Sequence, residues 1–228
     1  MSEGAEALLL GRRSVRAFLP DPVPRADLER ILRAARQAPS GANLQPGRFH
    51  VLTGAPLVAL SAALVAAAEA GRAPVAEYSY FPEPMGEALK AKQRAAGFAL
   101  YAALGIGRRD IAARRDQFNA NYRFFGAPVG IVVTIRRDMG KGCFMDLGMA
   151  LMGLMTAAGA RGLATCGIGA LANYGDVAHA HLGLEPDEMV VCGMALGWAD
   201  VRAAVNRVRT ERDALEDYAS FRGFSPSA

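Results

Sequence analysis

Gly11-Arg-Arg-Ser-Val-Arg-Ala-Phe18 is the stretch around which we expect the rest of the chain to be organised. It places three arginines and a serine within five residues, Arg12 to Arg16. A guanidinium group is planar, permanently charged and able to bind two phosphate oxygens at once, and a serine hydroxyl adds a short neutral donor. Taken alone, such a cluster is more typical of a solvated basic surface. The stretches that follow it favour an anion-binding site instead.

The composition predicts one folded domain that binds small molecules. The chain has 228 residues, of which 52% are hydrophobic and 21% are charged, so it can bury a sizeable core. The net charge of +4 is a mild excess, and the arginines are not interleaved with aromatic residues as in a groove for single-stranded nucleic acid. We therefore expect small anionic ligands as partners, and we do not expect nucleic acid.

The cysteines and the N-terminus predict a cytoplasmic protein. Cys143, Cys166 and Cys192 are odd in number and lack CxxC spacing, which predicts neither a disulfide framework nor a metal site. The first residues lack the basic and apolar segments of a signal peptide, and no apolar run reaches membrane-spanning length. We expect no membrane partner.

Hydrophobic periodicity predicts alternating helices and strands. Helices are expected over 5–10, 25–38, 57–70, 87–104, 110–123, 144–160 and 176–182, and strands over 48–52, 128–135 and 189–196. Residues 163–170 hold Thr-Cys-Gly-Ile-Gly and predict a small-residue turn that permits close backbone approach.

Pro39-Ser-Gly-Ala-Asn-Leu-Gln-Pro46 is a loop of short polar side chains. Ser40 and Asn43 could bind a planar heterocycle or simply close a turn, and both readings stay open. Gln45 precedes a proline and is predicted to be extended.

Residues 72–125 form a predicted helical lid or insertion. Tyr78, Tyr80 and Phe81 lie among prolines at its start, and Phe124 lies at its end. These aromatic side chains could form the ceiling of a pocket for planar molecules, or could pack residues 72–125 against the rest of the domain. The last residues, 199–228, are polar with sparse apolar anchors and predict an arm that embraces a partner subunit.

No side chain is predicted to carry catalysis. No glycine-rich dinucleotide fingerprint, P-loop or HExxH motif is present, and no nucleophile with an adjacent base is indicated. If the protein is an enzyme, a cofactor supplies the chemistry.

Four stretches, in order along the chain, together resemble the FMN-dependent nitroreductase family: 12–18, 38–46, 159–169 and 206–216. Residues 101–129 look like the subgroup related to nitrobenzoate reductases. The resemblance implies a single α+β domain over 1–228, with a central mixed or antiparallel sheet flanked by helices. It also implies a homodimer with two FMN sites at the interface and an exchanged C-terminal arm.

The resemblance also assigns site residues. The FMN phosphate would be held by Arg12, Arg13, Ser14 and Arg212 with Arg209 as helper, and Arg16 would lie by the pyrimidine edge. Pro39, Ser40, Asn43 and Gln45 would come from the other subunit, and Gly167, Ile168 and Gly169 would present backbone N–H groups to the ring. Substrate contacts are expected from Tyr78, Tyr80, Phe81, Asn121, Phe124 and Phe144. The sequence departs from the subgroup at 167–169, often Pro-Gln-Ala there, and at Phe144, often Trp.

The implied activity is an oxidoreductase in which FMN accepts a hydride at N5 from NADH or NADPH. A nitroarene, quinone or activated alkene then occupies the same pocket and is reduced, which makes the mechanism ping-pong. A specialised flavin enzyme on the same fold stays open as an alternative, such as a peptide-heterocycle or diketopiperazine oxidase, a flavin-cleaving enzyme or a dehalogenase. A non-catalytic flavin store is a third possibility.

Overall fold

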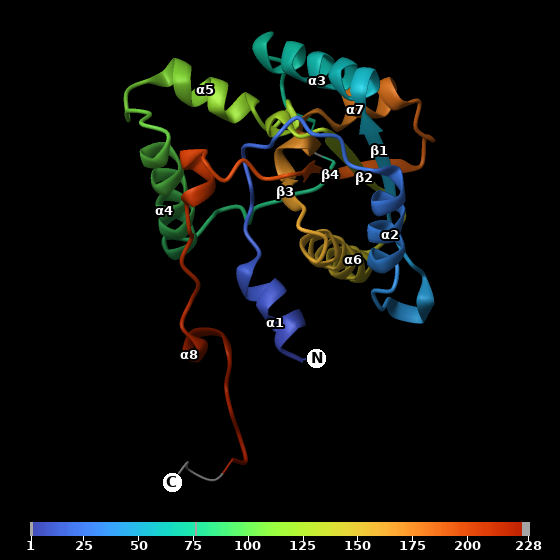
Figure 1. Ribbon diagram of the computed structural model, residues 1–228, viewed down its shortest axis with the longest axis vertical. Helices are drawn as coiled ribbons and strands as arrows, with labels where there is room; N and C mark the ends of the chain where they lie inside the picture. The colour runs from blue at the N-terminus through green and yellow to red at the C-terminus, as the bar shows by residue number, and fades with distance from the viewer. Residues whose placement is uncertain (1, 76, 225–228) are drawn as a thin grey trace.

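The architecture is a four-stranded sheet between two layers of helices (Figure 1). The computed structural model describes residues 2–75 and 77–224, so the first residue, one residue of the predicted lid and the last four of the predicted arm lie outside the described residues. The strands are β1 (Arg48–Thr53), β2 (Val129–Arg136), β3 (Ala164–Ile168) and β4 (Glu188–Gly197). Their order is β1-β2-β4-β3, and each neighbouring pair is antiparallel. The predicted α+β sandwich is confirmed.

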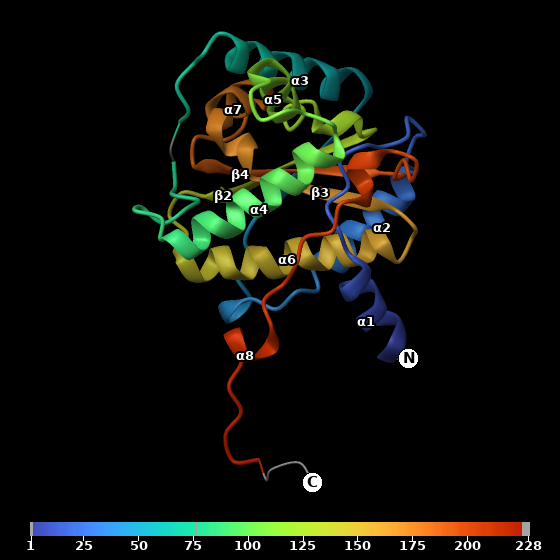
Figure 2. The same ribbon diagram turned by 90° about the vertical axis from the view of Figure 1, so that its left-hand side faces the viewer.

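Strand β2 shows why the sheet is covered on both faces. Successive side chains of a strand point to opposite faces of the sheet, and nearly all those of β2 are buried, so both faces must be covered. Val129, Ile131 and Val133 pack in the layer of α2 (Arg25–Ala35) and α6 (Lys141–Gly159). Val132 packs in the layer of α3 (Gly54–Glu69) and α7 (Gly175–Leu182). Figure 2 shows these two layers on opposite sides of the sheet.

Helix α6 is the long apolar helix expected near 144–160. By length and composition alone it could cross a membrane, and it lies along the sheet, burying Leu147 and Leu154 against it (Figure 2). Met145 and Met149 remain 71% and 42% exposed on its outer side. The structure thus leaves part of an apolar helix uncovered.

The prediction of a turn over 163–170 is wrong, because residues 164–168 form strand β3. Ile168 pairs with Gly193 of β4, and a Cβ placed on Gly193 would lie 3.5 Å from the Cβ of Ile168. A turn begins only at Gly169, in the short 3-10 segment Gly169–Tyr174.

The predicted lid, residues 72–125, and the two ends of the chain complete the fold. Helices α4 (Glu87–Ala103) and α5 (Ile111–Asn119) lie within the ranges expected for them. Helix α1 (Ser2–Gly11) and the segment bearing α8 (Leu215–Tyr218) extend away from the body (Figures 1 and 2). The tail exposes four large apolar side chains, those of Leu215, Tyr218, Phe221 and Phe224. The boundaries of the lid and of the arm stay predictions.

Candidate functional site

The arginine-rich segment lies along the outer edge of the sheet. Directly after α1, Ser14 forms a parallel bridge with Thr165 of β3, and the N–H of Val15 donates to the carbonyl of Thr165 at 3.0 Å. This backbone pairing turns Val15 into the core, where it is 2% exposed. Its neighbours Ser14 and Arg16 are half-buried. The edge strand therefore sets the direction of the side chains in the segment.

Asn206 joins the C-terminal segment to this edge. Its buried side chain accepts a hydrogen bond from the N–H of Arg16 at 2.8 Å. It also donates to the carbonyls of Ala17 and Asp200, both at 2.8 Å. These bonds hold the following arginines beside the first group. A cavity of about 340 Å³ results, and six of the predicted site residues line it: Arg12, Arg13, Ser14, Arg16, Arg209 and Arg212.

The charges of this cavity are uncompensated within the described chain. None of its five arginines lies within salt-bridge distance of a carboxylate there, whereas many arginines elsewhere do. The Nε of Arg13 is buried and has no hydrogen-bond partner among the described residues. Within residues 2–75 and 77–224, the guanidinium of Arg212 bonds only to oxygens of Thr210 and Glu211. A buried donor without a partner is costly, so the residues fit an anion with several oxygens, such as a phosphate.

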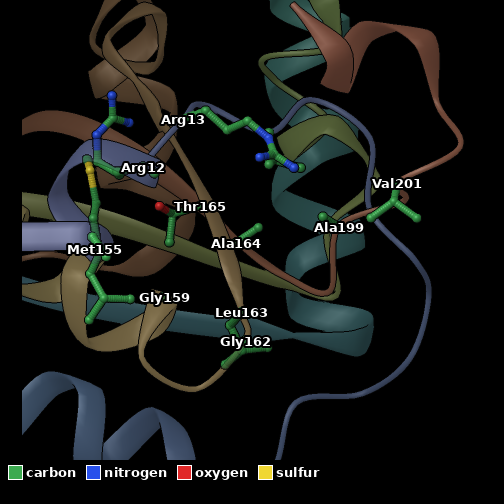
Figure 3. A pocket seen from close by; sticks show the side chains of 14 residues that line it. Arg12, Arg13, Met155, Gly159, Gly162, Leu163, Ala164, Thr165, Ala199 and Val201 are labelled. Atoms are coloured by element: carbon green, nitrogen blue, oxygen red, sulfur yellow. The ribbon is translucent and has the colours of Figure 1, made fainter. Parts of the chain in front are cut away.

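A second cavity of about 350 Å³ adjoins the first, since Arg12 and Arg13 line both (Figure 3). Figure 3 shows Thr165 of β3 between the two arginines in this view, with Met155 and Gly159 of α6 below. The site thus combines cationic and apolar surfaces along one strand. Such a pairing suits a ligand with a charged end and an apolar body.

Gly167, Ile168 and Gly169 occupy the other end of β3. At about 3.3 Å per residue, Gly169 lies roughly 13 Å along the chain from Thr165. Ile168 is 1% exposed and its side chain belongs to the core, so only its backbone is available to a ligand. The ring of Tyr80 lies against Gly169, where an added Cβ would be 2.8 Å away. The lid therefore meets the sheet at this end.

The predicted residues of the 39–46 loop lie together but apart from the arginines (Figures 1 and 2). Pro39, Ser40 and Gln45 line a small pocket beside Asp146 of α6, and Asn43 is exposed nearby. The prediction that Gln45 is extended is wrong, because its φ is 49°. Its carbonyl accepts a 2.6 Å hydrogen bond from the guanidinium of Arg36, and this contact overrides the preference before proline.

The lid aromatics divide into anchors and exposed residues. The hydroxyl of Tyr78 donates to the carbonyl of Val191 at 2.6 Å, its ring packs 5.9 Å from that of Phe144, and burial raises its pKa to about 12. Tyr80 and Phe81 are 64% and 52% exposed. Tyr78, Tyr80 and Phe81 line an open cavity of about 720 Å³ that also includes Gly169. This cavity is the candidate substrate pocket.

Two other substrate candidates take different places. The prediction for Phe124 is wrong, because its ring is fully buried where Gly130 and Gly193 leave room on the sheet. An added Cβ would lie 3.0 Å from the ring at Gly130 and 3.3 Å from it at Gly193, so the ring occupies the space that side chains there would need. The amide of Asn121 bonds locally to the carbonyl of Phe118 at 2.8 Å, and its contact with substrate stays a prediction.

The cysteine in this edge strand is not an activated nucleophile. Burial raises the pKa of the Cys166 thiol, although the charge of Arg16 and a bond from Ser14 favour the thiolate. Burial also raises the pKa of Cys192 to about 12. Both thiols therefore stay protonated at neutral pH, in line with chemistry supplied by a cofactor.

Sequence reasoning missed the roles of Asn206 and Thr165. Asn206 opens the stretch 206–216, so its position was visible, but its burial and its bonds to residues near 16 were not. Thr165 contributes its backbone, which leaves no signal in the sequence.

Asn206→Ala is expected to lower the free energy of unfolding by about 2 kcal/mol. The carbonyls of Ala17 and Asp200 keep second partners, so the main loss is the orphaned N–H of Arg16, for which roughly 1–3 kcal/mol is typical. Urea denaturation measures the change, with Asn121→Ala as control because its single bond is local. Equal effects for the two variants would contradict the assigned role of Asn206.

The comparisons with known proteins identify the family of the chain. The model described as "Nitroreductase family" matches residues 9–198. The chain is 37% identical over 225 residues to a 4-nitrobenzoate reductase of Pseudomonas putida, covering 98% of each chain. It is 40% identical over 217 residues to a chloronitrobenzene nitroreductase of Comamonas testosteroni, covering 94% of this chain and 95% of that protein. The solved structure of the FMN-dependent nitroreductase NfnB from Mycobacterium smegmatis, in complex with NADPH, aligns with a TM-score of 0.92 and 34% identity. The alignment covers 96% of this chain and 98% of NfnB.

Proposed function

The chain belongs to the nitroreductase family, and from this premise we propose that it is an FMN-dependent oxidoreductase that reduces nitroaromatic compounds with NADH or NADPH. The observation that carries the proposal is the cavity of five arginines without carboxylate partners in the described chain, one of them with a buried, unpartnered Nε. A phosphate-terminated cofactor satisfies that arrangement.

Different residues of the site would bind different parts of FMN. Arg12, Arg13, Ser14 and Arg212 would hold the phosphate, with Arg209 as helper. Arg16 would lie by the pyrimidine edge, its backbone held by Asn206. The backbone of Gly167, Ile168 and Gly169 would face the ring. When bound, FMN would supply hydride transfer at N5 between NAD(P)H and the acceptor, and the use of one pocket by both would make the mechanism ping-pong.

A homodimer is part of the proposal. The outer face of α6 exposes Met145 and Met149, helix α1 exposes Leu9 and Leu10, and the tail exposes four more large apolar side chains. Such apolar surface in one chain supports an interface. A second subunit would also bring a copy of the 39–46 loop to the arginine cavity, from which the loop of the same chain is separated. The free thiols of all three cysteines support a cytoplasmic location.

Tyr80→Ala and Phe81→Ala are each expected to change the rate of acceptor reduction roughly two- to tenfold, the range for an aromatic contact of about 0.5–1.5 kcal/mol. FMN content should stay unchanged because the arginine cavity lies elsewhere. Stopped-flow mixing of pre-reduced enzyme with several nitroarenes and quinones isolates this step. Phe118→Ala is the control within the same predicted lid, since Phe118 lies on α5, does not line the cavity of Tyr80 and Phe81, is similarly exposed and packs on Tyr122. Wild-type rates in both lid variants would remove the lid from substrate selection.

The proposed function is tested on purified protein by identifying the bound flavin and its reactions. Heat release and chromatography should yield FMN, and anaerobic NADH or NADPH should bleach the flavin. Nitrobenzene, 4-nitrobenzoate or a quinone should then restore the colour. FAD as the main species, or no bleaching by either nicotinamide, contradicts the proposal. A specialised oxidase would instead be bleached by its own substrate and reoxidised by oxygen.

A further inference from the structure

We infer that Arg36 is a positioning residue, which holds the 39–46 loop in a strained, preset shape so that the loop completes the FMN site of the neighbouring subunit. The inference rests on the proposed function. It concerns a residue that contacts no cofactor itself and acts through the loop.

The guanidinium of Arg36 donates hydrogen bonds to three consecutive backbone carbonyls. Its Nη1 donates to the carbonyls of Gln45 and Pro46 at 2.6 and 3.2 Å, and its Nη2 donates to that of Gly47 at 2.7 Å. Its Cζ lies 5.7 Å from the ring centroid of Phe49. No carboxylate of the described chain lies within salt-bridge distance of it. The hydrogen bonds of the guanidinium therefore go to the backbone at the end of the loop, residues 45–47.

The loop needs such a tie because its backbone is strained. Ala42, Asn43 and Gln45 have φ values of 50°, 57° and 49°, in the left-handed region that favours glycine. Such conformations are costly, above all for Ala42 and Gln45, so the shape persists only where surrounding contacts enforce it. Asp146 of α6 provides a second tie, since its Oδ2 accepts a 3.1 Å hydrogen bond from the N–H of Gly41. The hydroxyl of Ser40 accepts a third bond, from the N–H of Gln45 at 2.9 Å.

The strain has no evident use within its own subunit. The side chains of Asn43 and Gln45 are exposed. In the part of the chain that the structure describes, the amide of Gln45 makes only a 3.3 Å bond to the carbonyl of Asn43. A rigid backbone that presents exposed amides is typical of a preorganised binding surface. The arginine cavity of the same chain lies elsewhere, so the ligand of this surface is expected to be held by the arginines of a second copy.

The first measurement is the dissociation constant of FMN. Arg36→Ala is expected to raise it at least tenfold, and Arg36→Lys to raise it as well, because an ammonium cannot reach three carbonyls as the planar fork does. Arg33→Ala is the matched control, since Arg33 lies in the last turn of α2, three residues before Arg36, is exposed, and among the described residues pairs only with Glu29. Asp146→Asn should show a smaller rise in the same direction and remains informative if Arg36→Ala does not fold. Binding within twofold of wild type in Arg36→Lys and Asp146→Asn overturns the inference.

The second measurement separates action in the neighbouring site from general damage. A mixed dimer that pairs an Arg36→Ala subunit with an Arg13→Ala subunit should bind one FMN with wild-type affinity. That site combines the intact arginines of the first subunit with the intact loop of the second. No wild-type site in the mixed dimer overturns the inference, since it means that Arg36 acts within its own subunit. If wild-type protein binds no FMN, the proposed function fails instead.

Discussion

Replacing Arg13 by alanine is expected to weaken FMN binding roughly a hundredfold, which corresponds to about 3 kcal/mol. Arg13 lines both cavities at the sheet edge and has a buried Nε with no partner among the described residues. Its charge-assisted hydrogen bonds to a phosphate would form where water does not compete freely. The loss should therefore lie at the upper end of the range for such bonds.

Fluorescence titration of the apoprotein with FMN measures this effect. Arg13→Lys should recover only part of the affinity, because a point charge cannot bind two oxygens as a guanidinium does. Arg212→Ala should cost less, about 1.5 kcal/mol, since its guanidinium is exposed and already bonded to Thr210 and Glu211. Arg202→Ala is the control, as Arg202 is exposed and pairs with Asp200. An unchanged affinity in Arg13→Ala would falsify the phosphate assignment.

Ending the chain after Ala214 is expected to abolish the proposed homodimer at micromolar concentration and to leave the protein largely free of flavin. The deletion removes the exposed Leu215, Tyr218, Phe221 and Phe224 but keeps Arg209, Arg212 and Asn206. Each large apolar side chain buried at an interface contributes up to roughly 1.5–3 kcal/mol. Loss of four per subunit therefore removes much of the association energy, and loss of the partner removes its loop from the site.

Sedimentation equilibrium with parallel flavin analysis tests this expectation. A full-length variant with Val58→Ser is the control, because Val58 is an exposed apolar residue on α3, in the layer opposite α6. A shortened chain that remains an FMN-loaded dimer would show that the tail is dispensable. A shortened chain that is monomeric yet binds FMN with wild-type affinity would show that the site lies within one subunit.

The amino-acid sequence by itself determined the elements and the family. Helix and strand patterns are local, so the 3.6-residue period predicted α2, and apolar or β-branched runs predicted α6, β2 and β4, all within a few residues. The arginines of 12–16 and 206–216 were visible as patterns in their own stretches, and the cavity brings them together as expected. Resemblance over four ordered stretches predicted the fold and the nitroreductase family, and both are confirmed.

The tertiary structure alone decided what depends on partners distant along the chain. Asn206 bonds to a residue 190 positions earlier, and no local pattern specifies such a contact. Phe124 is in the core because glycines of two strands leave room for its ring, and β3 is a strand because β4 pairs with it. Gln45 departs from the conformation expected before proline because three carbonyls face one guanidinium. In each case packing and hydrogen bonding across the fold outweigh a local preference of about 1 kcal/mol, the usual size of such propensities.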